Sequence, residues 1–172
     1  MGKTQDDLKA AFAGESQANR RYLAFAKAAE AEGKPNLAKL FRAAAEGETV
    51  HALNHLRVLG EVKTAVDNLQ AAIAGETYEF ETMYPGFIAD AQAEKNKGAE
   101  LSFSNANSVE KIHQGKYSEA LKQVENGDDI DDQEYHVCSI CGNLFSGAVP
   151  DICPICKVSK QKFYLVSYSN KP

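Results

Sequence analysis

Two pairs of residues in this sequence place a histidine three positions after a glutamate: Glu48 with His51, and Glu110 with His113. Residues three apart on an α-helix share a face, so each pair can direct a carboxylate and an imidazole at one point. Oxygen and imidazole ligands suit iron or manganese. One such pair alone is also a common surface arrangement, and its repetition favours a metal site.

The repetition includes a further glutamate in each half of the chain. Ala13-Gly14-Glu15-Ser16 recurs as Ala74-Gly75-Glu76-Thr77 at an offset of 61 residues, and the Glu-x-x-His pairs recur at an offset of 62. One glutamate from each of two helices, with Glu-x-x-His from each of two others, is the ligand set of dimetal carboxylate bundles. We therefore predict a di-iron or di-manganese site with these ligands: Glu15, Glu48, His51, Glu76, Glu110 and His113.

Helices must bring these side chains together. The region is rich in Ala, Glu, Leu and Lys, and its Gly and Pro residues predict helical segments at 5–31, 36–59, 67–95 and 99–125. The apolar stripe of each segment carries a carboxylate near its middle. Burying an unpaired carboxylate costs several kcal/mol, so cations must lie among these carboxylates. No Lys or Arg falls in the stripes, which favours metal ions as the cations. Pro85-Gly86 predicts a kink or local break in the third segment.

Other polar side chains lie near these ligands in the helical pattern. Glu79 is one turn beyond Glu76 and would add a seventh ligand, while an exposed helix carboxylate is the alternative. Tyr22 and Tyr84 can lie beside the site or belong to an ordinary core. His55 is expected in the core or behind the ligands.

The cysteines form a second candidate metal site. All four lie in the last 35 residues, as Cys138-x2-Cys141 and Cys153-x2-Cys156, a spacing that lets four thiolates converge on one ion. Spacing alone does not choose between iron and zinc. An iron held by four thiolates can relay single electrons to a dimetal site, whereas zinc would make this a structural ribbon.

The character of the sequence changes after the fourth helical segment. An acidic linker at 127–134 precedes short β-like runs and turns around the cysteines. We predict an all-α four-helix bundle over 1–134, which includes this linker, and a small four-cysteine β domain over 135–172.

The composition excludes several classes of protein. The 172 residues include 19 Lys and Arg against 24 Asp and Glu, a net charge of -5, so no basic field is available for nucleic acid or an anionic membrane surface. No apolar run approaches the roughly 20 residues of a membrane-spanning helix, and the start has no secretory apolar region. We expect a cytoplasmic protein.

Taken together, these motifs resemble those of the rubrerythrin family, in which a ferritin-like di-iron four-helix bundle precedes a rubredoxin-like domain. The resemblance covers nearly the whole chain. The matching stretches are FAGESQANRRY (12–22), ETVHALNH (48–55), IAGETYEFETMYP (73–85), EKIH (110–113), and CSICG and CPIC with Lys160 and Phe163.

The resemblance implies a non-haem peroxidase that defends against oxidative stress by reducing hydrogen peroxide to water. Electrons would come from an external donor, rubredoxin or an NAD(P)H-dependent reductase, through iron in the rubredoxin-like domain. It also implies that Glu79 is a ligand that exchanges with His51 as the oxidation state changes, and that Tyr22 and Tyr84 lie near the metals. A ferritin-like ferroxidase that handles iron, or a zinc-ribbon scaffold, are the alternatives.

One residue departs from the pattern of simple rubredoxins, which usually have Gly after the second cysteine of each knuckle. Gly142 fits that pattern, but Lys157 occupies the second position. We expect Lys157 to adopt the left-handed conformation at a cost of about 1 kcal/mol.

The link between the second and third helical segments constrains assembly. The second segment would be about 38 Å long at about 1.5 Å per residue, whereas the six residues 61–66 span at most about 25 Å. A crossover that returns along the bundle therefore does not fit. The alternatives are an up-down-up-down bundle or, as the resemblance favours, a homodimer that exchanges hairpins, with 1–60 of one chain packed on 67–125 of the other.

Overall fold

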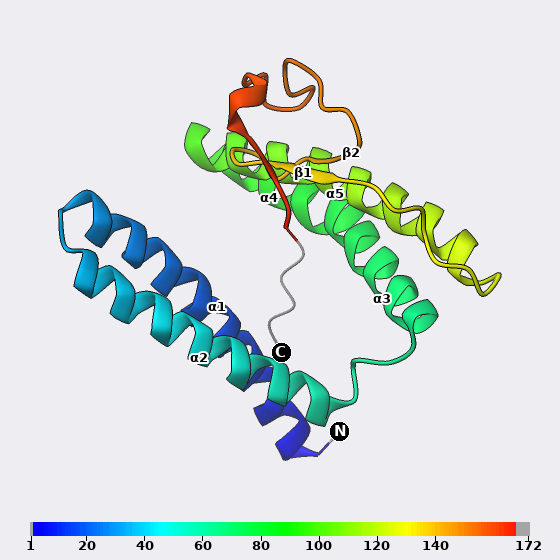
Figure 1. Ribbon diagram of the computed structural model, residues 1–172, viewed down its shortest axis with the longest axis horizontal. Helices are drawn as coiled ribbons and strands as arrows, with labels where there is room; N and C mark the ends of the chain where they lie inside the picture. Colours follow the sequence, from blue (N-terminus) through cyan, green and yellow to red (C-terminus); the bar gives the residue numbers. More distant parts are fainter. Residues whose placement is uncertain (1, 168–172) are drawn as a thin grey trace. The chain divides into compact units, whose positions relative to one another are not determined.

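The computed structural model describes residues 2–167, in two compact units, Met1–Lys63 and Thr64–Pro172. The first unit is a hairpin of two antiparallel helices, α1 (Lys3–Ala31) and α2 (Pro35–Leu59), shown in blue and cyan in Figure 1. Gly33 makes the connecting turn with a φ of 72°, a conformation that Gly adopts without steric cost. Pro35 then starts α2, where its missing N–H leaves no helical hydrogen bond unmade.

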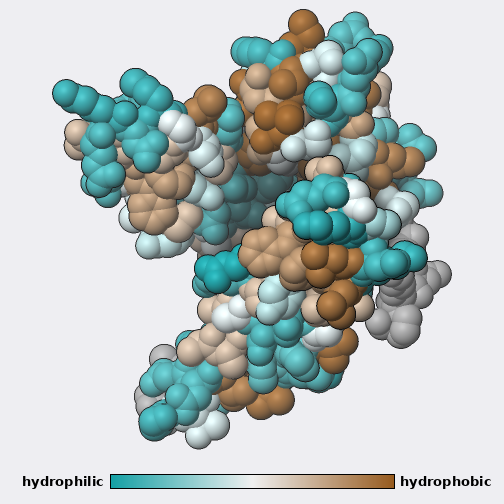
Figure 2. Space-filling model, turned by 90° about the vertical axis from the view of Figure 1, so that its left-hand side faces the viewer, coloured by the Kyte–Doolittle hydropathy of each residue, from teal (hydrophilic) through white to brown (hydrophobic). Residues whose placement is uncertain are grey.

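Small side chains form the interface of this hairpin. The buried apolar residues of the two helices are alanines, none more than 7% exposed: Ala26, Ala29, Ala38, Ala45 and Ala52. Larger apolar side chains remain at the surface, with Leu40 65% and Val58 68% exposed. Figure 2 shows hydrophobic patches, in brown, among the hydrophilic residues of the face that it draws. The predicted stripes therefore lie beside the helix contact, and the carboxylates on them are half-buried rather than enclosed.

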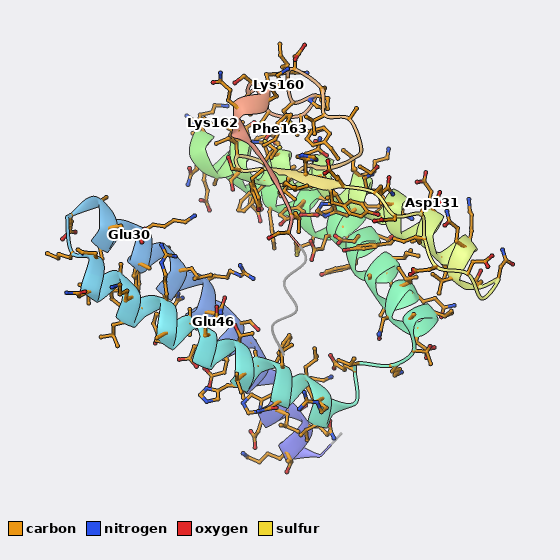
Figure 3. The ribbon with its side chains drawn as sticks, in the orientation of Figure 1. Glu30, Glu46, Asp131, Lys160, Lys162 and Phe163 are labelled. Carbon is orange, nitrogen blue, oxygen red and sulfur yellow. The ribbon has the colours of Figure 1, made fainter. Side chains whose placement is uncertain are left out.

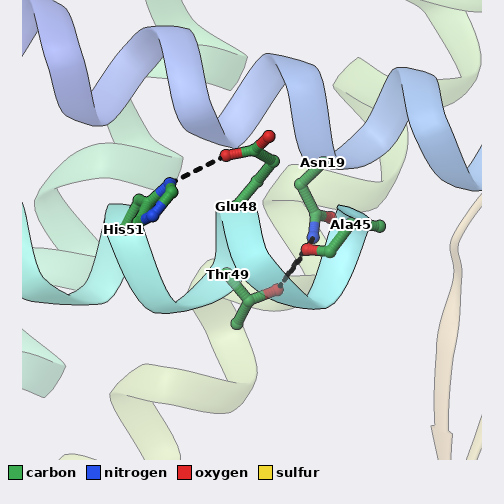
Figure 4. A network of polar contacts seen from close by, with 5 residues as sticks. All are labelled: Asn19, Ala45, Glu48, Thr49 and His51. Atoms are coloured by element: carbon green, nitrogen blue, oxygen red, sulfur yellow. Dashed lines mark hydrogen bonds and ion pairs between the residues drawn. The ribbon is translucent and has the colours of Figure 1, made fainter. Parts of the chain in front are cut away.

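A polar clamp fixes how α1 and α2 face each other. Asn19 is 9% exposed, and its Nδ2 donates to the Ala45 carbonyl oxygen at 2.7 Å and to Thr49 Oγ1 at 2.8 Å (Figure 4). At the turn end of the hairpin, Arg42 Nη2 donates to both carboxylate oxygens of Glu30 at 2.8 Å. These contacts set the register in which the predicted metal ligands of the two helices meet.

The second unit begins with the remaining helical segments. They are α3 (Ala65–Tyr78), the π-helical turn η1 (Glu79–Met83), α4 (Tyr84–Ala93) and α5 (Lys97–Val124). Thr64 caps α3 by accepting from the Asp67 N–H, and Asn96 caps α5 by accepting from the Ala99 N–H. All four predicted helical segments are confirmed within two residues at their ends.

The predicted break in the third segment takes the form of η1. The Tyr84 N–H donates to the Glu79 carbonyl, five residues earlier, instead of to the residue four earlier. Pro85 follows directly and has no N–H to continue the helical ladder. The wider turn therefore falls just before the Pro-Gly pair rather than on it.

A small antiparallel sheet follows, with strand order β2-β1-β3. Its strands are β1 (Tyr135–Cys138), β2 (Leu144–Ser146) and β3 (Phe163–Leu165), and the Phe145 and Phe163 rings stack at 4.7 Å. The 3-10 turn η2 (Lys160–Lys162) leads into β3; Figure 3 labels both lysines and Phe163 there. The predicted fold class, a helical protein with a small four-cysteine β module, is confirmed.

Two details of this module bear on the sequence analysis. Lys157 has a φ of 63°, so the predicted left-handed conformation is confirmed, and its Nζ donates to the Pro154 carbonyl at 2.7 Å. Lys160 forms an ion pair with Asp151 at 2.6 Å, which closes the loop before η2. Among residues 2–167, none of the helices has the length and apolar content needed to cross a membrane.

We expect Asn19→Ala to lower the free energy of unfolding of the iron-free chain by about 1–3 kcal/mol, because a buried hydrogen-bonded amide is lost. Thermal or urea unfolding followed by circular dichroism measures this loss. The matched control is Asn54→Ala on the exposed side of α2, where Asn54 Oδ1 accepts from Arg57 and the change should stay within about 0.5 kcal/mol. Equal effects of the two substitutions would contradict the clamp.

Candidate metal centres

The first hairpin brings three predicted ligands together. Glu15 on α1 and the pair Glu48 and His51 on α2 have ligand atoms that all lie within 4.8 Å of one another. His51 Nδ1 lies 3.0 Å from Glu48 Oε2 (Figure 4). The three-residue spacing therefore does converge two side chains of α2, and the facing helix adds a third.

The second unit repeats this arrangement with Glu76 on α3 and the pair Glu110 and His113 on α5, again within 4.8 Å. His113 Nδ1 lies 2.9 Å from Glu110 Oε2 and 3.8 Å from Glu76 Oε1. The His113 side chain is 24% exposed, whereas the His51 side chain is 59% exposed. We call the two groups half-sets; they are alike in ligand types and unequal in the exposure of their histidines.

The carboxylates of the second half-set repel one another. Burial, the charges of Glu110 and Glu79, and a hydrogen bond with Glu110 raise the pKa of Glu76 to about 7. Burial and the charge of Glu110 also raise the pKa of Glu79, against the opposing effect of His113. The structure thus places Glu79 within electrostatic reach of this half-set, although it is not one of the three convergent ligands. A bound cation would replace the proton that relieves this repulsion.

Tyrosines border the second half-set. Burial and then the charges of Glu110, Glu79 and Glu76 raise the pKa of Tyr84. Burial and the charges of Glu76 and Glu110 raise the pKa of Tyr117, which lies seven residues after Glu110 on α5 and was not singled out from the sequence. Both hydroxyls therefore stay protonated well above neutral pH and can donate hydrogen bonds near the ligands.

Tyr22 and Tyr84 occupy equivalent places in duplicated aromatic clusters. Tyr22 packs against Phe25 and Phe41, and Tyr84 packs against Phe87 and Phe103. The ring centroids within each cluster are 5.5–6.3 Å apart. Phe87 and Phe103 each lie 62 residues after the equivalent ring of the first cluster. This constant offset of 62 residues between matching aromatic residues is a signal in the sequence from which the two clusters could be predicted.

The π-helical turn explains why the repeat offset changes. Glu15 and Glu76 are 61 residues apart, but Tyr22 and Tyr84 are 62 apart, so one residue has been inserted between Glu76 and Tyr84. That interval contains η1 (Glu79–Met83), and a π-turn absorbs one extra residue without unwinding the helix. Glu79 opens the turn, so the inserted residue and the additional carboxylate occur at the same place.

The four cysteines converge as predicted. Cys138 Sγ lies 3.6 Å from Cys156 Sγ, and Cys141 Sγ lies 3.6 Å from Cys153 Sγ. Each of these close pairs consists of one sulfur from the first knuckle and one from the second. For sulfurs about 2.3 Å from a central ion, the edge of the tetrahedron is about 3.8 Å. The geometry therefore fits one tetrahedral metal ion.

Backbone N–H groups point at the cysteine sulfurs. Burial opposes ionisation of Cys153, but hydrogen bonds from the N–H groups of Cys156 and Ile155, together with those from the Cys141 and Cys156 thiols, lower the pKa of the Cys153 thiol to about 7. Burial raises the pKa of Cys141 despite the N–H of Asn143. These donors are oriented to stabilise thiolates, the form in which cysteine binds metal.

Comparison with known proteins agrees with this geometry. A family model described as Rubrerythrin matches residues 6–121, and a second, described as Rubrerythrin, rubredoxin-like domain, matches residues 136–164. The chain belongs to the rubrerythrin family. Membership confirms the expected cofactors, a di-iron centre at the Glu and His groups and a metal at the four cysteines.

Individual members of the rubrerythrin family are similar along most of the chain. Rubrerythrin-2 from Clostridium acetobutylicum is 36% identical over 174 residues, covering 93% of this chain and 95% of the relative. Nigerythrin from Nitratidesulfovibrio vulgaris is 36% identical over 177 residues, covering 95% and 86%. Solved structures of nigerythrin in mixed-valent and fully reduced, all-ferrous states give TM-scores of 0.56 and 0.57 at 35% and 34% identity, each covering 96% of this chain and 88% of that chain.

We expect the iron-free protein to lose stability as the pH rises from about 4.5 to about 7. The folded pKa of Glu76 is raised to about 7 from an ordinary value of 4.5, so over this range the folded state binds more protons than the unfolded state. Urea unfolding at several pH values measures the slope. Glu76→Gln should flatten it, whereas Glu81→Gln, an exposed position of the same segment, should not. An unchanged slope in Glu76→Gln would contradict this assignment.

Proposed function

We propose that the protein is a non-haem di-iron peroxidase that reduces hydrogen peroxide to water for oxidative-stress defence. The observation that carries the proposal is the pair of matching half-sets in a chain that also has a four-cysteine site. The reaction consumes two electrons and two protons for each peroxide, breaks the O–O bond and yields two waters. A dimetal site supplies two electrons together, and a four-thiolate iron accepts replacements one at a time.

The ligands in this proposal are the two half-sets together with Glu79. When bound, the two irons supply the electrons that cleave the peroxide. The carboxylates compensate the charge of the metals, and the hydroxyls of Tyr22 and Tyr84 donate hydrogen bonds toward the peroxide. Tyr84 is suited to this because its raised pKa keeps its proton in place among three carboxylates.

The unequal histidines support a ligand exchange. His51 lies 3.0 Å from Glu48 alone in these pairs, whereas His113 lies between Glu110 at 2.9 Å and Glu76 at 3.8 Å, so His51 is the less restrained of the two histidines. Glu79 supplies the replacement carboxylate from the π-helical turn. An added carboxylate compensates the greater charge of oxidised iron.

Electrons enter through the four-cysteine site in this proposal, which divides the chain into a peroxide-reducing domain over 1–134 and an electron-accepting domain over 135–172. Iron rather than zinc occupies the cysteines, because zinc carries no electrons. The external donor is rubredoxin or an NAD(P)H-dependent reductase. We further propose that the protein works in the cytoplasm.

The test is to reduce the iron-loaded protein anaerobically, mix it rapidly with hydrogen peroxide or with O2, and follow both iron sites optically. We expect reoxidation by peroxide to be roughly tenfold faster than by O2, or more, with the iron–thiolate band returning after the di-iron centre reacts. A faster reaction with O2 would favour a ferroxidase. A chain that binds no iron at its cysteines would favour a zinc-ribbon scaffold.

A pair of glutamate variants makes this test specific. Glu79→Ala should slow peroxide-driven reoxidation, because the carboxylate that balances the oxidised metals is lost. Glu81→Ala lies two residues along the same π-helical turn but is exposed, so it should react at the wild-type rate. Equal rates in the two variants would contradict the role of Glu79.

We also propose that the di-iron sites are completed in a homodimer that exchanges hairpins. Helix α2 has 25 residues and is about 38 Å long, while only Gly60–Thr64 separate it from α3. A parallel return within one chain therefore does not fit. Exposed apolar residues such as Leu40 and Val58 provide surface for a second chain to cover.

Complementation between two inactive chains tests the exchange. One chain carries Glu48→Ala and His51→Ala, and the other carries Glu110→Ala and His113→Ala. In an exchanged heterodimer one of the two sites combines both intact hairpins, so each heterodimer should recover about half of the activity of a wild-type dimer. An unexchanged protein leaves every site damaged and restores nothing. Light scattering should give twice the 18.7 kDa mass of the chain, and a monomer would contradict the proposal.

A further inference from the structure

Asn143 is an unusual occupant of the interior of the cysteine module. It directly follows Gly142 of the first knuckle, and it is 2% exposed, although asparagine is mostly found at protein surfaces. Its Oδ1 is buried without a hydrogen-bond partner among the described residues. An apolar side chain of similar size would avoid the cost of this unpaired oxygen, so packing alone does not account for an amide here.

The contact that the amide does make is with a cysteine sulfur. Asn143 Nδ2 lies 4.0 Å from Cys153 Sγ, which belongs to the second knuckle. The backbone N–H of Asn143 points at Cys141 Sγ, and its carbonyl accepts from the Cys138 N–H at 2.9 Å. One residue therefore contacts three of the four cysteines and reaches across from one knuckle to the other.

The local backbone holds Asn143 in this place. Gly142 adopts a φ of 82°, which turns the chain back so that the following residue faces the sulfurs. Asn143 then precedes β2 (Leu144–Ser146), which pairs with β1. Because both its neighbours are fixed, the side-chain amide has few other directions to point.

We propose that Asn143 is a positioning residue for the four-cysteine iron, whose side-chain amide donates a hydrogen bond to the Cys153 thiolate and raises the reduction potential of the site. One-electron reduction adds a negative charge to the iron and its thiolates without breaking a bond. An N–H dipole directed at sulfur stabilises the more negative state, so it favours reduced iron. The proposal requires iron at the cysteines and does not require that peroxide be the substrate.

The experiment is a spectroelectrochemical titration of the iron–thiolate band in the full-length, iron-loaded protein. Asn143→Leu removes the donor at similar volume, and Asn143→Asp replaces it with an anion. We expect the reduced-to-oxidised ratio at the wild-type midpoint to fall about tenfold in Asn143→Leu, a shift of about 59 mV, and further in Asn143→Asp. The same substitutions at Asn126, which donates to the Lys122 carbonyl at the end of α5, are the matched controls.

The outcomes separate a tuning role from a structural one. A midpoint within a twofold ratio of wild type in an Asn143→Leu protein that retains its iron would overturn the proposal. Should the variants fail to bind iron, nitrogen-labelled wild-type protein loaded with an NMR-active cadmium isotope decides the question. We expect scalar coupling from the metal to the Asn143 side-chain amide. Coupling only to its backbone N–H would show that the backbone bond forms and the side-chain bond does not, which would overturn the proposal.

Discussion

Repulsion among carboxylates is the constraint on which the helical part of this protein depends. Each half-set gathers two glutamates and a histidine within 4.8 Å on half-buried helix faces. In the second half-set without a cation, a proton relieves this repulsion, as the pKa of Glu76 at about 7 indicates. Metal binding replaces that proton, so the same side chains that destabilise the iron-free chain stabilise the loaded one.

Close helix packing makes this gathering of charge possible. In the first hairpin, a stripe of alanines lets α1 and α2 approach, and Asn19 fixes their register through the Ala45 carbonyl and Thr49. With the register fixed in this way, Glu48 on α2 lies close to Glu15 on α1. The larger apolar side chains are left at the edge, where they provide surface for further association.

The second half of the chain modifies a duplicated plan at one point. Its aromatic cluster and ligand spacing repeat those of the first half, but the π-helical turn inserts one residue after Glu76. The insertion brings in Glu79, for which the first half-set has no equivalent. Together with the greater exposure of the His51 side chain, this makes the surroundings of two otherwise similar half-sets unequal.

The sequence by itself determined the helical segments, the convergence of Glu48 with His51 and of Glu110 with His113, and the tetrahedral cysteine group. These features depend on helical periodicity and short knuckle spacing, which are local. Only the tertiary structure decided the alanine interface, the place of Tyr117 and the contact of Asn143 with Cys153. Those depend on which surfaces meet when distant segments pack. The π-helical turn could be predicted only in part. The change of repeat offset from 61 to 62 residues indicates an extra residue in the sequence, but only the folded chain shows the hydrogen bonding that accommodates it.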